Sequence, residues 1–287
     1  MRFRNGAWGY FFILPNLFFL ALFLIYPLLH TFYLSLFEAD IYSKAFVGFH
    51  NYISLFHEER FVKSFVNTFY FVIIIVPITV CISLLFAVMM QGFHKHAKSF
   101  FRLVFYLPVV STPVVLSLVW AWIYNPSFGI LNYFLQELGF QPIDVFSNQL
   151  TAILALAAVV ITWMIGQPII LYLSSMDGIS KDLFESAELD GANSIQTFVK
   201  ITLPLIANTT ILIVITSTIS VFQIFTVVYL LTKGGPFHGT ESLVYTIYQT
   251  AFIDLEFGKA SAQSVVLFFI IMLIAVLQFR ILRSKGE

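Results

Sequence analysis

The sequence has few charged residues and a single cysteine, and both shortages restrict what it can encode. Of its 287 residues, 10% are charged and 59% are hydrophobic, whereas a soluble domain usually has about 25% charged residues. The mean hydropathy of +0.91 agrees with this shortage, so the composition predicts a polytopic membrane protein. One cysteine, Cys81, excludes a disulfide framework, and a net charge of zero gives no support for a nucleic-acid partner.

Motifs for catalysis and energy coupling are also missing. The sequence contains no GxxxxGK[ST] phosphate loop, so the chain is not expected to bind ATP in that way. The run His57-Glu-Glu-Arg-Phe61 lacks the second histidine of a zinc-protease motif, and GxSxG does not occur. The apolar segments have no central carboxylates or lysines, which ion-coupled transporters generally need. We therefore expect no catalytic residues, no metal and no cofactor, and an external source of energy.

Six apolar segments are long enough to cross a bilayer, which requires about 20 residues. The first is too long for a signal-peptide core and is expected to remain as a membrane helix. The pattern predicts an all-α membrane protein in which residues 1–287 form a single transmembrane domain. The predicted spans are residues 10–36, 66–91, 101–124, 149–175, 206–232 and 261–282.

The distribution of basic residues predicts the orientation of these segments. With the N-terminus inside, ten lysines and arginines fall on the cytoplasmic side and five fall outside. Because basic residues accumulate on the cytoplasmic side, both termini are predicted to be cytoplasmic. The polar segment between the fourth and fifth spans then faces the cytoplasm.

That polar segment is the most unusual part of the chain. It holds seven charged residues between Asp177 and Lys200, and each would cost about 2.5–3.5 kcal/mol at the centre of a bilayer. Such a concentration of acidic side chains suggests a surface presented to a soluble partner. A merely solvated connecting loop is the alternative.

The segment has the capping residues of two short helices. Ser180 is a candidate N-cap, and Gly191 can end the first helix in a left-handed conformation. Asn193, with Gln196 three residues later, predicts a capping box for a second helix. Pro204 is expected to mark the turn into the fifth span.

A family resemblance follows from the same residues. The run Glu185-Ser-Ala-Glu-Leu-Asp-Gly-Ala192, with Phe198, Ile201, Leu203 and Pro204, resembles the EAA loop of permease subunits of binding-protein-dependent ABC importers. Two departures are Ser186 in place of alanine and Ala207 in place of a second proline. Four further segments are similar to the carbohydrate-importing branch of the maltose and glycerol-3-phosphate type: Phe46–Tyr52, Tyr229–Pro236, Tyr248–Phe252 and Phe257–Ala262.

The resemblance implies a type I ABC importer permease fold in a bacterial or archaeal cytoplasmic membrane, with residues 177–206 as a cytoplasmic coupling elbow. It implies as partners a second, similar permease in a heterodimer, two ATP-binding cassette subunits that bind the ATP, an extracytoplasmic sugar-binding protein and membrane lipid. Glu185 would be the charged anchor and Gly191 the bend. The residues expected to couple to the ATPase are Glu185, Ala187, Asp190, Gly191, Phe198, Leu203 and Pro204.

A pathway for sugars needs hydroxyls, amides and aromatic rings without charge. The fifth span offers Thr209, Thr216, Ser220 and Gln223 on one face, and the fourth offers Trp163 and Gln167; Trp120, Trp122 and Tyr124 lie near the end of the third. The same residue types commonly join membrane helices or anchor them at the interface, so both interpretations stay open.

Two other functions remain as alternatives. An ion-coupled secondary sugar transporter would show uptake without ATP, and a non-transporting membrane scaffold would show no sugar-dependent ATP hydrolysis in its assembled complex. The sequence names neither the sugar nor the residues that contact it.

Overall fold

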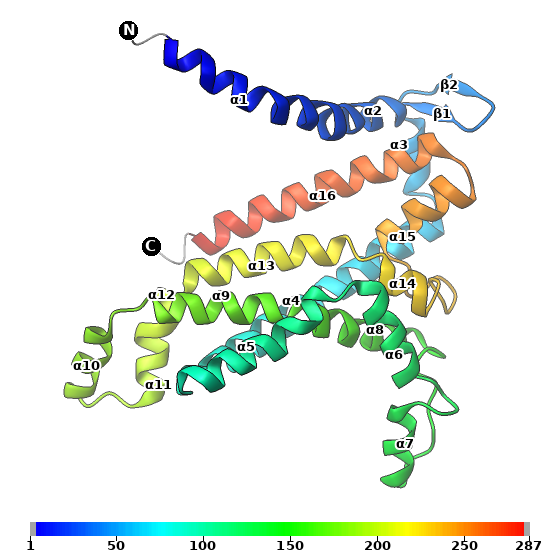
Figure 1. Cartoon of the computed structure of the whole chain (residues 1–287). Helices are drawn as coiled ribbons and strands as arrows, with labels where there is room; N and C mark the ends of the chain where they lie inside the picture. Colours follow the sequence, from blue (N-terminus) through cyan, green and yellow to red (C-terminus); the bar gives the residue numbers. More distant parts are fainter. Residues whose placement is uncertain (1–3, 284–287) are drawn as a thin grey trace. The chain divides into compact units, whose positions relative to one another are not determined.

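The computed structural model describes residues 4–283 and is predominantly helical (Figure 1). The chain divides into two compact units. The first consists of residues 1–62 and 246–269, and the second consists of residues 63–245 and 270–287.

The first unit begins with a long helical segment that is apolar on all sides. Helix α1 (Arg4–Leu20), a π-helical turn η1 (Ala21–Ile25) and α2 (Tyr26–Leu34) follow one another without interruption. None of the most apolar 18-residue stretch within Phe12–Leu34 is buried in the protein. A helix with such a surface is suited to lipid or to another membrane helix rather than to water.

A short β-hairpin follows, which the sequence did not predict. Strand β1 (Phe37–Ala39) pairs antiparallel with β2 (Lys44–Phe46). Asp40 Oδ1 closes the turn by accepting hydrogen bonds from the backbone N–H groups of Tyr42 and Ser43, each at 2.6 Å. The hydrogen bonds from Ser43 and Tyr42 lower the pKa of Asp40. Because the side-chain cap is local, the turn keeps its shape although it is exposed.

The rest of the first unit is helical. It comprises α3 (His50–Leu55), the π-helical turn η3 (Gln249–Ile253) that continues α15 (Leu243–Tyr248), and the beginning of α16 (Phe257–Arg283). Gly258 lies so close to Phe37 that an added Cβ would stand 1.9 Å from its carbonyl oxygen. Lys259 forms ion pairs with Glu58 and Glu256 at 2.9 and 3.3 Å.

The second unit contains the remaining helices, and bent helix pairs are its main feature. Helices α5 and α6 meet at 98°, and α8 and α9 meet at 45°. Pro113 begins α6, and the Thr112 side chain accepts a hydrogen bond from Val115 N, so the first bend has a local cause. The helices of this unit, apart from those between α9 and α13, are α4 (Glu59–Gln91), α5 (Lys95–Val110), α6 (Pro113–Ile123), α7 (Ile130–Glu137), α8 (Gln149–Met164), α9 (Gly166–Asp177), α13 (Ala207–Phe222) and α14 (Thr226–Leu231).

Two apolar clusters hold the second unit together. One joins α4 to α8 through side chains such as Phe71, Ile75 and Leu156. The other joins the end of α4 to α9 and α13, with Tyr172 and Ile213 fully buried. At Gly166 an added Cβ would lie 2.2 Å from the carbonyl oxygen of Phe105, so glycine permits the close approach of α9 to α5.

The helices allow six membrane crossings, as predicted, but three of the predicted spans are interrupted. By length and composition, three described helices can cross a membrane singly, and six crossings result if each bent pair counts as one. The third and fourth predicted spans are each broken, at residues 111–112 and at Ile165, and residues 223–225 interrupt the fifth. The single-domain organisation and the membrane boundaries remain predictions.

Buried asparagines fix three of the polar connections. Each donates its Nδ2 group to two backbone carbonyls of a neighbouring loop, at distances of 2.9–3.2 Å. Asn51 holds residues 35–37 in the first unit. In the second unit, Asn67 holds residues 238–241 and Asn132 holds residues 126–143. Without such donors these carbonyls would lose hydrogen bonds in a partly buried setting, which is costly.

Candidate functional site

The polar segment between α9 and α13 forms two helical arms, as the capping residues predict. The first arm is α10 (Lys181–Leu189), and the second consists of α11 (Ser194–Thr197), the π-helical turn η2 (Phe198–Thr202) and α12 (Leu203–Leu205). Both arms project from the ends of α9 and α13 (Figure 1). The predicted coupling elbow covered residues 177–206; the two arms and the residues that join them cover residues 180–205, and the word elbow refers to this range from here on.

The first arm is capped at both ends. The Ser180 side chain accepts a hydrogen bond from Asp182 N, which confirms the predicted N-cap. At the other end, Gly191 N donates to Glu188 O at 3.0 Å and Ala192 N donates to Ala187 O at 2.9 Å. These are the two hydrogen bonds of a Schellman motif, with Gly191 in the left-handed conformation at φ 78°.

The second arm begins with the predicted capping box. Asn193 Oδ1 accepts from Gln196 N, and Gln196 Oε1 accepts from Asn193 N, both at 2.9 Å. The prediction of the turn at Pro204 is wrong by two residues. Pro204 lies inside the arm, because proline is accepted in the first turn of a helical segment, and the chain bends by 65° at Ile206.

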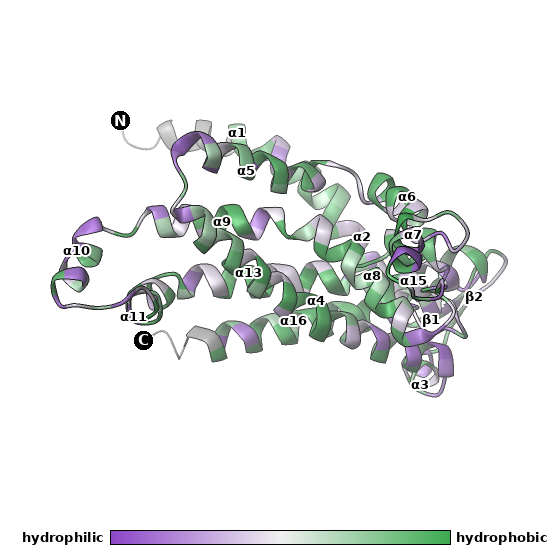
Figure 2. Ribbon diagram, turned by 90° about the horizontal axis from the view of Figure 1, so that it is seen from below, coloured by the Kyte–Doolittle hydropathy of each residue, from purple (hydrophilic) through white to green (hydrophobic). Residues whose placement is uncertain are grey.

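The elbow presents charged and apolar side chains together. Glu185 and Asp190 are exposed, as are Leu203 and Pro204, while Phe198 is half-buried and Ala187 is buried. Leu189 and Ile195 are 89% and 74% exposed. Hydrophilic and hydrophobic residues alternate along α10 (Figure 2). A surface of this kind suits a protein interface with an apolar centre and a charged rim.

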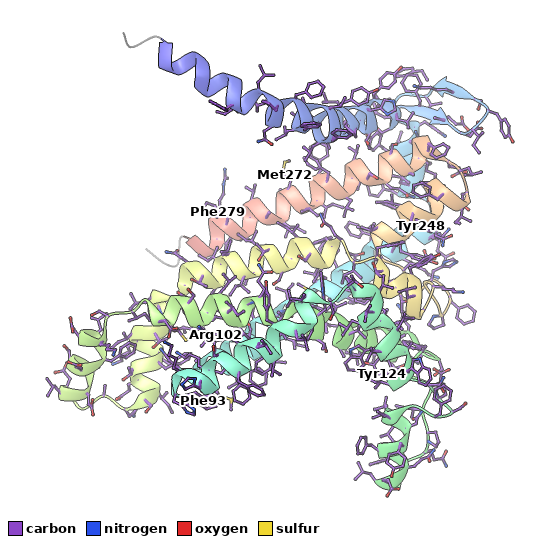
Figure 3. The ribbon with its side chains drawn as sticks, viewed as in Figure 1. Phe93, Arg102, Tyr124, Tyr248, Met272 and Phe279 are labelled. Atoms are coloured by element: carbon purple, nitrogen blue, oxygen red, sulfur yellow. The ribbon has the colours of Figure 1, made fainter. Side chains whose placement is uncertain are left out.

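Asp177, the first acid of the polar segment, does not belong to this surface. Its carboxylate pairs with Lys98 Nζ at 2.8 Å and with the Arg102 guanidinium at 2.9 Å, both from α5; Arg102 is labelled in Figure 3. The expectation that the acidic residues are presented together is therefore wrong for Asp177. Its ion pairs join α9 to α5 at the base of the elbow.

Away from the elbow, the five predicted pathway residues line two adjoining cavities in the second unit. The first cavity measures about 90 Å³ and is lined by Trp163, Gln167, Thr216 and Ser220 together with Val109, Met164 and Ser217. The second measures about 190 Å³. Trp163 and Ser220 line both, and Gln223 lines the second. We call the two together the cavity pair.

The cavity pair lies where three helical segments break. Val109 and Pro113 flank the break between α5 and α6, Met164 and Gln167 flank the break between α8 and α9, and Gln223 begins the break between α13 and α14. Interrupted helices within a membrane are tolerated where they line a cavity or are buried in protein. The position of the breaks thus supports a pathway at this point.

The hydrogen bonds separate the two interpretations that the sequence left open. Thr209 Oγ1 donates to Ser175 Oγ at 2.9 Å, so Thr209 joins two helices. Thr216 Oγ1 donates to Leu212 O. Within residues 12–281, the side chains of Gln167, Ser220 and Gln223 make no hydrogen bond, and the buried Nε1 of Trp163 has no acceptor. The polar groups of these four side chains have no partner among the described residues, and their role as substrate contacts stays a prediction.

Among the cavity-lining residues that the sequence did not single out, one is aromatic. Phe225 lines the second cavity and stacks on Tyr229 and Tyr245, with ring centroids 5.3 and 6.3 Å apart. It is one of 34 phenylalanines, and nothing in its neighbourhood distinguishes it. For Tyr124, the structure favours the helix-joining interpretation that the sequence left open, since its hydroxyl donates to Ala155 O at 3.1 Å; Tyr124 is labelled in Figure 3.

None of the described residues that line the two cavities is charged. Within the described residues, there is also no cluster of three or more metal-binding side chains. The arrangement can hold an uncharged molecule through hydrogen bonds and ring contacts.

These features define the membrane-spanning part of a transporter, and the comparisons with known proteins agree. The chain belongs to the family described as binding-protein-dependent transport system inner membrane component, whose sequence profile matches residues 45–284. It is therefore a permease subunit of such a transport system and an integral membrane protein.

Among its relatives is the sn-glycerol-3-phosphate transport system permease protein UgpA of Escherichia coli O157:H7, which is 31% identical over 99% of this chain and 96% of the relative. The probable ABC transporter permease protein YurN of Bacillus subtilis strain 168 is 33% identical over 99% of each chain. A bacterial ABC transporter involved in import of the acidic polysaccharide alginate contains a chain of the same fold, with a TM-score of 0.88, 20% identity and coverage of 99% of this chain and 98% of that one. The all-α permease fold is thereby confirmed.

Proposed function

We propose that this permease forms half of the translocation pathway of an ATP-driven importer for a sugar, an oligosaccharide or a related polyol. The observation that carries the proposal is the cavity pair, where unpaired amide, hydroxyl and indole groups meet without any charge. Sugars offer hydroxyls to such groups and apolar ring faces to aromatic side chains. The names of UgpA and the alginate importer give sn-glycerol-3-phosphate and an acidic polysaccharide. Both compounds carry several hydroxyls, which supports a hydroxyl-rich substrate, but both are anionic, so the neutral charge of the substrate is inferred from the cavity pair alone.

The size of the cavities supports a second permease. Sites for small molecules usually measure about 300–1,000 Å³, whereas the two cavities measure about 90 and 190 Å³. A similar subunit with a matching surface would complete a chamber of the required size. We infer a heterodimer from the resemblance to the maltose and glycerol-3-phosphate type.

The elbow supplies the connection to an energy source. We infer that both chain termini and the elbow are cytoplasmic, and that Glu185, Asp190 and the exposed apolar residues of the elbow dock on one of two ATP-binding cassette subunits. These subunits bind the ATP, since this chain has no phosphate loop. An extracytoplasmic binding protein delivers the sugar. A complex with a periplasmic protein is known for the alginate importer.

The test is uptake by the complete complex in proteoliposomes, with its binding protein, ATP inside and a panel of neutral di- and trisaccharides. The charged comparison is sn-glycerol-3-phosphate. We expect uptake of a neutral sugar that requires ATP. Uptake that persists without ATP would indicate ion coupling, and a complex that neither transports nor hydrolyses ATP in response to any sugar would indicate a scaffold.

Two substitutions test the cavity pair within that assay. Gln223→Leu keeps the volume but removes the amide, so we expect transport efficiency to fall about two- to tenfold for the loss of one hydrogen bond. Thr209→Val is the control, because its hydroxyl is bound to Ser175, and it should lower the stability of the complex without changing substrate preference. Equal effects of both substitutions on substrate preference would contradict the assignment.

A further inference from the structure

The loop of residues 232–242, between α14 and α15, has a strained backbone that neither the elbow nor the cavity pair explains. Lys233, Phe237 and His238 have positive φ values of 50°, 48° and 63°. Residues other than glycine seldom adopt this conformation, which is strained and persists only where the surroundings impose it. Such strain is concentrated at functional surfaces.

Helices of the second unit impose the conformation from outside the loop. Asn67 Nδ2 on α4 donates to the carbonyl oxygens of His238 and Glu241, at 2.9 and 3.2 Å. The Asn67 amide is itself oriented by Gln149 of α8, whose Nε2 donates to Asn67 Oδ1 at 3.2 Å. Asn67 is only 2% exposed, so these bonds form in a setting where their loss is expensive.

Further bonds hold the loop from within. Thr240 Oγ1 donates to Gly235 O at 2.7 Å, and the Tyr245 hydroxyl donates to Lys233 O at 2.9 Å. Thr240 is fully buried. The loop is therefore a rigid element whose shape does not depend on a ligand.

The consequence of this rigidity is the display of one aromatic ring. Phe237 is 92% exposed, although the next residue, His238, is fixed by the hydrogen bond from Asn67 to its carbonyl oxygen. Because the backbone that carries the ring is already fixed, binding costs less backbone entropy, and preorganised aromatic residues dominate many interfaces. If the loop were disordered, binding through the same ring would lose more conformational entropy.

We propose that Phe237 is an anchor that enters an apolar pocket on the extracytoplasmic binding protein. This inference rests on the proposed function and its orientation, which place the loop outside. Within the second unit, α14 lies at the end of α13 remote from the elbow (Figure 1), so the loop faces away from the ATPase. Lipid headgroups are deformable and select no particular backbone geometry, so the imposed strain favours a protein surface over the membrane.

The experiment uses the full permease–ATPase complex in nanodiscs and measures ATP hydrolysis while its sugar-loaded binding protein is titrated. Phe237→Ala should raise the half-maximal concentration of binding protein at least about tenfold, as loss of an interface anchor does. Phe237→Tyr should stay within about threefold of wild type. Phe140→Ala is the matched control, because Phe140 is an exposed aromatic (64%) of another loop, and it should have no effect.

Phe237→Gly separates binding from folding. Glycine accepts a positive φ without cost, so this variant should lose binding to the same extent while the complex melts at an unchanged or higher temperature. An unchanged half-maximal concentration for Phe237→Ala, an equal loss with Phe140→Ala, or dissociation of the permease pair would each overturn the proposal. If wild type itself shows no stimulation by the binding protein, the proposed function fails instead.

Discussion

The elbow and the 232–242 loop are both polar connections of the second unit, but different contacts hold them. Within residues 180–205, the fixing bonds join residues two to five positions apart: Ser180 to Asp182, Ala187 to Ala192, and Asn193 to Gln196. The 232–242 loop depends on Asn67 and Gln149, which are far away in the sequence. Local contacts thus fix the shape of the elbow, whereas long-range contacts tie the loop to helices α4 and α8.

The largest effect is expected from removing the long-range clamp. Asn67→Ala would deprive the His238 and Glu241 carbonyls of a donor, so the loop should lose about 2–4 kcal/mol of local stability. Hydrogen exchange followed by mass spectrometry should show faster exchange in residues 232–242 than in wild type. The exchange rates in the elbow should not change.

The control for that variant is Asn132→Ala, which removes the same kind of clamp from residues 126–143. Faster exchange should then appear there and not in residues 232–242. Identical exchange patterns for the two variants would show that the asparagines stabilise the whole unit rather than individual loops.

An intermediate effect is expected at the bend of the elbow. Gly191 has φ 78° and no atom within 4 Å of an added Cβ, so the cost of Gly191→Ala is conformational rather than steric, about 1–2 kcal/mol. Sugar transported per ATP hydrolysed should fall while the subunit remains in the membrane. Gly191→Asn is the control, because asparagine tolerates this conformation better than alanine. If Gly191→Asn transports as little sugar per ATP as Gly191→Ala, the left-handed conformation at residue 191 is not what coupling requires.

The smallest effect is expected at the capping box. Asn193→Ala should cost about 1 kcal/mol of helix stability in the second arm, and Asn193→Asp, which keeps the acceptor for Gln196 N, should cost less. The measurement is the exchange rate of the Thr197–Ile201 amides. If these amides exchange equally fast in Asn193→Ala and Asn193→Asp, the cap does not stabilise the arm.

The difference between the two regions also explains which features were predictable. Ser180, Gly191 and the Asn193–Gln196 pair were assigned correctly, because a helix cap depends on residues within one turn. The bend at Ile206 was placed two residues too early, since proline permits a helical first turn. The hairpin at residues 37–46 was missed because it is three residues per strand and depends on Asn51 and Gly258.

The pathway residues show the same limit at longer range. Trp163, Gln167, Thr216, Ser220 and Gln223 were chosen for chemical type, and the structure places all five at the cavity pair. Their grouping depends on three breaks in helices, and only one of these, at Pro113, has a strong local cause. Only the hydrogen bond from Thr209 to Ser175 shows that Thr209 joins two helices, unlike the residues that line the cavities.

By itself, the sequence determined the membrane class, the helical fold, the family and the position of the elbow. These follow from hydrophobicity and from spacings of a few residues, which act before any tertiary contact forms. Only the tertiary structure decided that Asp177 is paired, that Asn67 clamps the 232–242 loop, and that Phe237 is displayed. Such outcomes depend on which distant groups meet in space, because a buried hydrogen bond needs both partners and the sequence shows only one at a time.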